Sequence, residues 1–390
     1  MPETYIEPMT NRQECFQCHK TVTGKKKLSK CAGCHAITYC GVECQREDFP
    51  RHKWNCLPVM VTEIPGKGRG LVAARDIKMG ELIFKDKAYI KIRADYHCGR
   101  PGSYTNASLL DQIENLPSEG KLQFYKLEIP YLPEDLNKKM NGHKELLIVL
   151  ANGTDDEIFW RLHLNIALIN HSCAPNAAKG LLQPEAGDDE SDTRLEIRAI
   201  KDILKGEEIT IFYDHPKNYR TIALKEERKN AFREMGFHCK CNACSGEIES
   251  QDEIVKEFLR VHAKLYPDPE PPKKGYVDWA QESKYFERYA ELSLRTDIGR
   301  ISDKTKMLDL LVIAAHMARD QDLLKKAMAM WKEVIENTKL EELRKPYEDA
   351  ERKLSQWTKN LKSKKSPKRK EEISFMGRFL PGGKDFKYCD

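Results

Sequence analysis

The sequence of 390 residues has no long apolar run and no hydrophobic leader. Its longest apolar stretches, residues 146–151 and 310–315, are much shorter than the roughly 18 residues that a membrane span needs. The first fourteen residues, MPETYIEPMTNRQE, contain no hydrophobic segment of the kind found in signal peptides. A membrane protein and a secreted protein are therefore not expected, and we expect the chain in the cytoplasm, the nucleus or both.

The chain also lacks a strong excess of charge of either sign. It has 66 Lys and Arg residues against 61 Asp and Glu residues, so the formal net charge is only +5. Residues 361–390 hold nine basic and four acidic residues, an excess equal to the whole net charge. Within them the run KSKKSPKRK at 362–370 predicts a flexible basic tail, which is a nuclear-localisation signal, a weak nucleic-acid contact or simply a solvated segment.

Several catalytic signatures are missing as well. The glycine-rich segment Gly66–Gly70 has the spacing of neither a P-loop nor a dinucleotide fingerprint. No paired-carboxylate or Ser-His-Asp signature is recognisable. The sequence therefore offers no motif for those chemistries.

What the sequence does contain is 13 cysteines, most of them clustered. Clustered cysteines in a chain without a secretion signal usually bind metal. Residues 15–56 provide four ligand pairs, and eight ligands fit two Zn²⁺ ions because a structural zinc takes four Cys or His ligands. The expected ligands are Cys15, Cys18, Cys31, Cys34, Cys40, Cys44, His52 and Cys56. The spacing favours alternation, with pairs one and three on one ion and pairs two and four on the other, but sequential pairing stays open.

The same block resembles a MYND zinc finger. The resemblance includes Tyr39-Cys40 followed by Cys44, and the ending RHKWNC at 51–56. MYND modules mainly bind short proline-containing peptides, so the resemblance implies such a partner; a purely structural finger is the alternative. The spacing is not that of a C2H2 finger, and nucleic acid is therefore not expected as the main partner.

Beyond residue 57 the sequence predicts short strands, then helices, then strands, then helices again, which is an α+β fold. β-branched and apolar runs punctuated by glycine predict strands at 59–62, 70–74, 81–92, 194–200 and 208–213. Helical periodicity is expected mainly at 106–165 and, as two or more antiparallel helix pairs, at 252–361. The acidic GDDESD at 187–192 predicts a solvated hairpin loop, and PDPEPP at 267–272 a loop or linker.

Three motifs of the middle segment, in their order, resemble a SET-domain protein methyltransferase. They are Gly66–Gly70, Asn170–Asn176 (NHSCAPN) and Gly206–Tyr213 (GEEITIFY). Together with the finger and the helical C-terminal region they resemble the SET- and MYND-domain (SMYD) family, although here the finger precedes the glycine-rich segment that it follows in the best-known members. The resemblance implies a β-rich SET fold with a knot-like arrangement that brings Asn170–Asn176 and Tyr213 side by side.

The resemblance also implies methyl transfer from S-adenosylmethionine to lysine side chains of histone or non-histone proteins. It assigns the catalytic role to Tyr213, whose hydroxyl would align the amine with the methyl group. The implied cofactor contacts are Lys67, Gly68, Arg69, Asn170, His171, Tyr213 and Phe237. Phe237 is alternatively a plain core aromatic, and His171 a buried histidine that holds the turn.

A third zinc site is expected near the end of this region. Cys239, Cys241 and Cys244 provide three thiolates, and a tetrahedral site needs a fourth ligand. Cys173 is the candidate, because SET proteins with a post-SET motif use the cysteine of the N-H-S-C segment. Three structural Zn²⁺ ions are then expected, with Cys98 and Cys389 left as free thiols.

The expected organisation has five parts. They are a MYND finger at 15–56, a SET domain at 57–214 with a helical insertion at about 106–165, a post-SET segment at 215–250, a helical C-terminal domain at 251–361 and the basic tail at 362–390. We expect a monomer. The alternative function is a non-catalytic scaffold or transcriptional corepressor that recruits partners through the finger, and the sequence names neither the substrate nor the degree of methylation.

Overall fold

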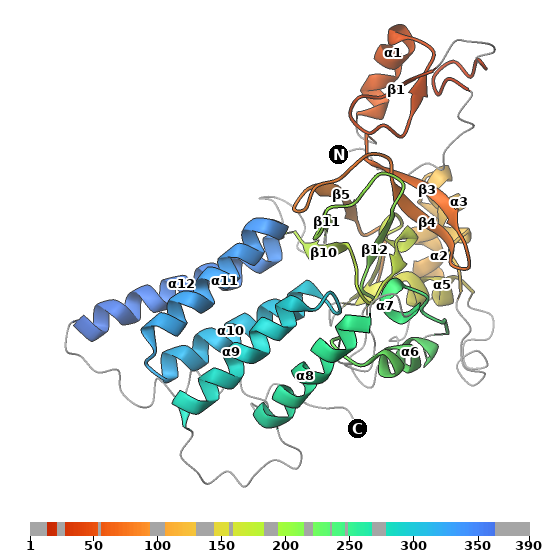
Figure 1. Cartoon of the computed structure of the whole chain (residues 1–390). Coiled ribbons are helices and arrows are strands. Elements are labelled where there is room, and N and C mark those ends of the chain that lie inside the picture. Colours follow the sequence, from red (N-terminus) through yellow and green to blue (C-terminus); the bar gives the residue numbers. More distant parts are fainter. Residues whose placement is uncertain are drawn as a thin grey trace. The chain divides into compact units, whose positions relative to one another are not determined.

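The computed structural model describes most of the chain as two compact units. It covers residues 14–21, 28–53, 56–93, 106–129, 144–155, 159–182, 194–213, 221–234, 236–245, 249–266 and 278–362. The larger unit consists of Met1–Asp252, Asp297–Arg300 and Asn337–Glu341, and the smaller one of Glu253–Thr296, Ile301–Glu336 and Glu342–Asp390 (Figure 1). The loops expected at 187–192 and 267–272, the basic tail beyond 362, and Cys98 and Cys389 lie outside the described residues.

The larger unit begins with a small finger built around cysteines. Strands β1 (Ser29–Lys30) and β2 (Thr38–Tyr39) form an antiparallel pair, and helix α1 (Val42–His52) follows. Its buried core consists of cysteines and Tyr39, whose hydroxyl donates a 2.7 Å hydrogen bond to Asp48. So small an apolar core leaves much of the folding free energy to metal binding.

After the finger, short strands form three sheets. The first has the order β3 (Val59–Ile64), β4 (Gly68–Ala73), β12 (Glu208–Ile211) and β9 (Asn170–His171). The second has the order β10 (Ala177–Leu181), β11 (Arg194–Ala199) and β5 (Leu82–Lys87), and the third β6 (Ile90–Arg93), β8 (Phe159–Leu162) and β7 (Thr154–Asp155). All these pairs are antiparallel except β12 with β9, which run parallel.

The first two sheets share one hydrophobic core. Alternate side chains of their strands point inward, and Leu71, Ile83, Ile197 and Ile209 are buried there together. This core fixes the ends of β4, β9 and β12, where the candidate site lies. The predicted strands in this region and the α+β fold class are confirmed.

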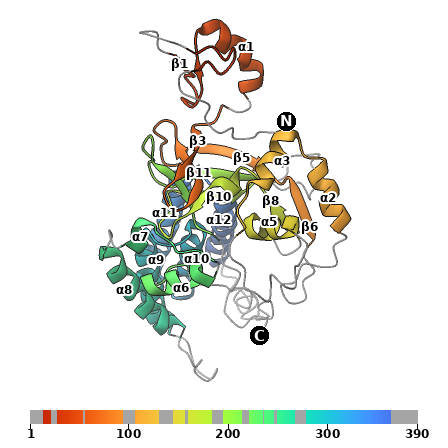
Figure 2. The same ribbon diagram turned by 90° about the vertical axis from the view of Figure 1, so that its right-hand side faces the viewer.

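The helical insertion is shorter than expected. Helices α2 (Asn106–Glu114), α3 (Ser118–Tyr125) and α5 (Lys144–Asn152) pack beside the third sheet in a core of their own (Figure 2). The prediction of helix up to 165 was wrong at its end, because 154–155 and 159–162 are strands that extend the sheet from β6. The aromatic Phe159 and Trp160 favour a strand once β6 offers an edge, and pairing outweighs the apolar helical pattern.

Helices make up the rest. After the last strand, β12, come α6 (Lys225–Glu234) and α7 (Asn242–Ser245), and α8 (Glu249–Leu265) leads into the smaller unit. That unit continues with α9 (Trp279–Arg295), α10 (Ile301–Met317), α11 (Gln321–Thr338) and α12 (Glu341–Lys362), which confirms the helices predicted there.

Packing inside the smaller unit is helix against helix. The rings of Phe258 and Tyr289 stack 4.3 Å apart between α8 and α9, and α9 lies along α10 (Figure 1). Asp278 caps α9 by accepting hydrogen bonds from the backbone N–H groups of Ala280 and Gln281. None of the helices in the described ranges is long and apolar enough to cross a bilayer.

Candidate functional site

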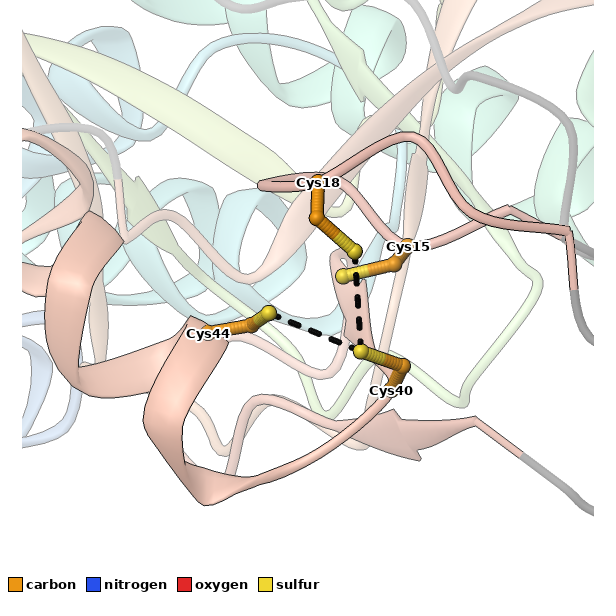
Figure 3. Close-up of side chains that lie close together, drawn as sticks. All are labelled: Cys15, Cys18, Cys40 and Cys44. Carbon is orange, nitrogen blue, oxygen red and sulfur yellow. Dashed lines mark hydrogen bonds between the residues drawn. The ribbon is translucent and has the colours of Figure 1, made fainter.

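Four cysteines of the finger gather their sulfurs around one point. Figure 3 shows Cys15 and Cys18 on one loop, Cys40 ahead of α1, and Cys44 on the first turn of that helix. Cys40 Sγ lies 3.6 Å from Cys18 Sγ and 3.5 Å from Cys44 Sγ, and all four sulfurs lie within 4.8 Å of one another. Because a zinc ion with Zn–S bonds of about 2.3 Å separates its sulfurs by about 3.8 Å, this set fits one Zn²⁺.

The second finger cluster combines three cysteines with a histidine. Cys31 Sγ lies 3.7 Å from Cys56 Sγ, and Nε2 of His52 lies 3.3 Å from Cys31 Sγ and 3.5 Å from Cys34 Sγ. The two clusters therefore take pairs one and three, and pairs two and four. The predicted alternation is confirmed, and sequential pairing is excluded by this geometry.

The third cluster joins two distant segments of the chain. Cys173 Sγ lies 3.8 Å from Cys239 Sγ and 3.5 Å from Cys244 Sγ, and Cys241 completes a buried set of four. The donor types and spacing of all three clusters suit closed structural sites, so they bind three structural Zn²⁺ ions.

Arg228 of α6 is fully buried beside this third cluster. Its guanidinium donates hydrogen bonds to the carbonyl oxygens of Ala223 and Ala243, which ties the start of α6 to α7. Burial alone would lower the pKa of Arg228, but the charges of Cys173 and Cys244 raise it. A buried positive charge therefore offsets part of the negative charge of four thiolates around one zinc ion.

The candidate active site is built on the parallel pairing of β9 and β12. Asn170 pairs with Thr210 and His171 with Ile211. The pairing brings the Asn170–Asn176 segment beside the segment that ends in Tyr213, as the resemblance implies. The hydroxyl of the half-buried Tyr213 donates a 2.8 Å hydrogen bond to the carbonyl oxygen of Ile169, which fixes the phenol at the end of the strands.

His171 links this tyrosine to the third zinc cluster. Its Nδ1 accepts a 3.0 Å hydrogen bond from the backbone N–H of Tyr213, which assigns the ring proton to Nε2, and Nε2 lies 3.3 Å from Cys173 Sγ. Burial lowers the pKa of His171 to about 3, so the ring is neutral. Both ring nitrogens are engaged with protein atoms, and a contact of His171 with a cofactor would use its backbone or its ring face.

Aromatic rings surround His171 and Tyr213. The ring of Phe237 lies edge-on to Tyr213 with centroids 6.1 Å apart, and 5.3 Å from that of Phe232. The ring of Phe232 lies 3.9 Å from that of His171. The sequence interpretation missed Phe232, which α6 places here on its buried side next to Ala231. Such a wall can exclude water and face a cation.

The glycine-rich segment reaches the same place from the other side. Lys67 Nζ lies 2.5 Å from Glu208 Oε2, and Asn170 Nδ2 donates to Glu208 Oε1 at 2.9 Å and to the carbonyl oxygen of Arg69 at 3.2 Å. The guanidinium of Arg69 instead donates to the carbonyl oxygen of Lys126 in the insertion. Lys67, Asn170 and the backbone of Arg69 are thus brought together, with Gly68 opening β4 between Lys67 and Arg69. Glu208 was missed, although it lies inside the third motif.

Asp86 supports the site from β5. It is buried, and its carboxylate accepts hydrogen bonds from the backbone and side chain of Asn165 and the backbone of Ile166, at 2.9 to 3.1 Å. These groups begin the short 3-10 turn η1 (Ile166–Leu168), which leads into β9. Sequence reasoning missed Asp86, which lies between Lys85 and Lys87 in β5 with no local pattern to mark it.

Comparison with known proteins agrees with this geometry. A SET domain model matches residues 68–214 and a MYND finger model matches 15–56. N-lysine methyltransferase SMYD2 of Homo sapiens is 24% identical over 332 residues, which cover 80% of this chain and 70% of that protein. N-lysine methyltransferase SMYD2 of Bos taurus is 26% identical over 334 residues, which again cover 80% of this chain and 70% of that protein. Histone-lysine N-methyltransferase SMYD3 of Homo sapiens is 25% identical over 255 residues, which cover 61% of this chain and 54% of that protein. The predicted order, a MYND finger before a SET domain, is confirmed.

Proposed function

We propose, because the chain belongs to the family of proteins that combine a MYND finger with a SET domain, that it transfers methyl groups from S-adenosylmethionine to lysine side chains of proteins. Its relatives are named as N-lysine and histone-lysine methyltransferases. The observation that carries the proposal is the β9–β12 pairing, which sets Asn170 and His171 beside Tyr213. Histone and non-histone proteins are both candidate substrates.

The residues of the chain bind, orient and exclude water. S-adenosylmethionine, when bound, supplies the activated methyl group. The lysine amine, with an ordinary pKa near 10.4, must lose a proton to attack. Aromatic, poorly hydrated surroundings at Tyr213 and Phe237 favour the neutral form of the amine. Burial, and after it the charge of Glu208, raises the pKa of Tyr213, so the phenol stays protonated and acts by orienting the amine.

Replacement of Tyr213 by Phe tests this role. We expect transfer of labelled methyl groups to a panel of proteins to fall roughly 100-fold, because a misaligned amine loses a factor of that order. Cofactor affinity, measured by calorimetry, should change little. Tyr125→Phe, at an exposed tyrosine of α3, is the matched control and should label like the wild type. Equal labelling by Tyr213→Phe and the wild type would remove Tyr213 from catalysis, and absence of cofactor binding by the wild type would favour the scaffold.

We also propose that the finger binds a proline-containing peptide. Two exposed apolar side chains of α1 support this: Val42 and Phe49 are seven residues apart and lie on one helix face, 63% and 52% exposed. Extended proline-rich segments bind against apolar and aromatic surfaces. Phe49→Ser should weaken binding of a fluorescent proline-rich peptide, and unchanged binding would contradict the assignment.

The state and location of the chain are part of the same proposal. We propose a monomer that works in the cytoplasm, the nucleus or both, with the basic run at 362–370 favouring nuclear entry. Sedimentation at micromolar concentration should give one species of monomer mass, and a dimer would contradict it. Imaging of the full chain with 368–370 changed to alanine should show reduced nuclear signal if the run directs import.

A further inference from the structure

Residues 297–300, most of the connection between α9 and α10, belong to the larger unit and not to the helical one. The backbone N–H of Asp297 donates a 2.8 Å hydrogen bond to Oε1 of Gln251 in that unit, and its carboxylate lies 2.6 Å from Nζ of Lys201. Ile298 is fully buried. The middle of this 297–300 loop is therefore part of the packed interior of the larger unit.

Gly299 brings the 297–300 loop against the third zinc cluster. Its backbone N–H donates a 2.9 Å hydrogen bond to the carbonyl oxygen of Cys173, whose sulfur belongs to that cluster. Gly299 has φ +97°, and a Cβ there would lie 2.8 Å from Cγ1 of Ile222 and 3.1 Å from Oγ1 of Thr221. Glycine is therefore needed for the loop to approach both Cys173 and the segment that leads into α6.

The contact at Cys173 continues towards Tyr213. Nε2 of His171 lies 3.3 Å from the Cys173 sulfur, and Nδ1 of the same ring accepts the backbone N–H of Tyr213. Between them, the backbone N–H of Ser172 donates a 2.9 Å hydrogen bond to the carbonyl oxygen of Ile211. The segment 171–173 is thus bound to β12 and the residues after it on one side, and to Gly299 at its carbonyl end.

We infer that Gly299 is a positioning residue for methyl transfer, because its hydrogen bond to Cys173 keeps residues 171–173, and through them Tyr213, in place. This rests on the proposed function and extends the site to a loop beyond the SET and post-SET segments. Gly299 acts through Cys173 and His171 and not on the reacting groups. A buried carbonyl oxygen that loses its donor favours local opening, so displacement of the loop should loosen the segment that carries His171.

Hydrogen exchange of the backbone in the full-length protein tests the inference. The variant is Gly299→Ala. Gly80→Ala is the matched control, since Gly80 has φ +80° and a Cβ there would lie 2.5 Å from the carbonyl oxygen of Asn337 at the end of α11. In Gly299→Ala we expect the amides of 170–176 and 208–213 to exchange roughly tenfold faster, because the loop no longer holds this region. In Gly80→Ala these two peptides should exchange as in the wild type.

Zinc release and kinetics give readouts that a general loss of stability would not produce. Gly299→Ala should release the third zinc ion to a chelator roughly tenfold faster, while the two finger ions leave at the wild-type rate. The third ion is identified as the release phase that Cys241→Ser lacks. For the protein of the panel that the wild type labels most strongly, kcat should fall roughly tenfold with KM unchanged, since positioning and not binding is lost.

The outcomes separate this inference from the proposed function. Unchanged exchange of the two peptides in Gly299→Ala, or equal acceleration in Gly299→Ala and Gly80→Ala, overturns the positioning role. A wild type that labels no protein, although exchange and zinc release respond as expected, overturns the proposed function instead.

A second pair of variants decides if Gly299→Ala does not fold. Gln251→Met removes the acceptor of the Asp297 N–H without adding a side chain to the loop, whereas Gln251→Glu keeps an acceptor. Gln251→Met should accelerate exchange of the same two peptides, and Gln251→Glu should resemble the wild type. Equal exchange in the two variants overturns the role of the loop.

Discussion

Asp86 is a buried carboxylate whose pKa is set by two opposing effects. Burial raises the pKa of Asp86 to about 7, although the N–H groups of Ile166 and Asn165 lower it. In the unfolded chain an aspartate has a pKa of about 3.9. The native state thus holds the proton more tightly, and the stability that the group contributes is complete below about pH 4 and lost as the pH rises towards about 7.

Asp86→Asn should remove this pH dependence. Asparagine keeps the shape, and rotation of the Asn165 amide can keep a hydrogen bond between the two side chains. Between pH 6 and 7 the free energy of unfolding of the wild type should fall relative to the variant by up to about 1.4 kcal/mol per pH unit, and the difference should level off above about pH 7. Urea unfolding at constant zinc from pH 6 to 8 measures it.

The comparison of variants cancels changes in metal affinity with pH, because both proteins carry the same zinc ligands. Asp202→Asn is the control: Lys78 and the backbone N–H of Met79 lower the pKa of Asp202, so this carboxylate stays ionised throughout the range. A constant difference between the wild type and Asp86→Asn from pH 6 to 8 would show that Asp86 does not titrate there.

Site residues could be predicted from the sequence where metal-ligand types recur at short, regular spacing. The finger ligands were found because paired Cys and His at short spacing admit few alternatives. A three-thiolate set needs a fourth ligand, and the resemblance to post-SET proteins identified it as Cys173. Glu208, Phe232 and Asp86 were not found. Their roles depend on contacts with residues far away in sequence, such as the 141 residues between Lys67 and Glu208, and no local pattern encodes such contacts.

At the scale of elements, β4 is shaped by the lack of a side chain at Gly70. Gly70→Ala would place its Cβ 2.6 Å from Cγ1 of Ile64 and 2.7 Å from Nδ2 of Asn170. We expect a loss of stability of roughly 1–3 kcal/mol from this overpacking. Displacement of Asn170 should also weaken the binding of S-adenosylhomocysteine. Calorimetry would measure the loss of affinity, and thermal unfolding the loss of stability.

Gly206→Ala is the control for Gly70→Ala, because it tests backbone strain without a contact with Asn170. Gly206 has φ +84°, a conformation unfavourable for alanine, but a Cβ there would meet nothing within 4 Å. It should therefore lose stability through strain while ligand affinity stays unchanged. If both variants bind S-adenosylhomocysteine equally well, contact with Asn170 is not what Gly70 avoids.

Helices and strands could be predicted where the periodic pattern of apolar residues was long enough. The five helices from α8 to α12 have 17 to 22 residues each and show clear periodicity. By contrast β9 and β7 have two residues each, too few for any periodicity, and they exist because a partner strand offers hydrogen bonds. The family resemblance implied only that Asn170–Asn176 and Tyr213 lie side by side, and the parallel register of β9 with β12 was not predicted.

For the whole molecule, the cysteines connect composition with architecture. Of the 13 cysteines, the eleven that fall within the described ranges all belong to the three clusters, with His52 as the twelfth ligand. The clusters differ in access to solvent: Cys40 in the first is exposed, whereas all four members of the third are buried. Metal content and the order of metal loss therefore report on the fold as a whole.

Metal analysis of the purified chain should give three zinc ions per molecule. Under a chelator in excess, the first cluster should release its ion fastest because solvent reaches Cys40, and the third slowest because release requires opening of the core around Cys173.

Cys241→Ser should reduce the zinc content to two ions per molecule and slow methyl transfer, since the third cluster holds His171 and, through it, Tyr213. Cys98→Ser, at a predicted free thiol, should keep three. Two zinc ions in the wild type would contradict the third site, and release of all three in a single phase would contradict the ranking by exposure.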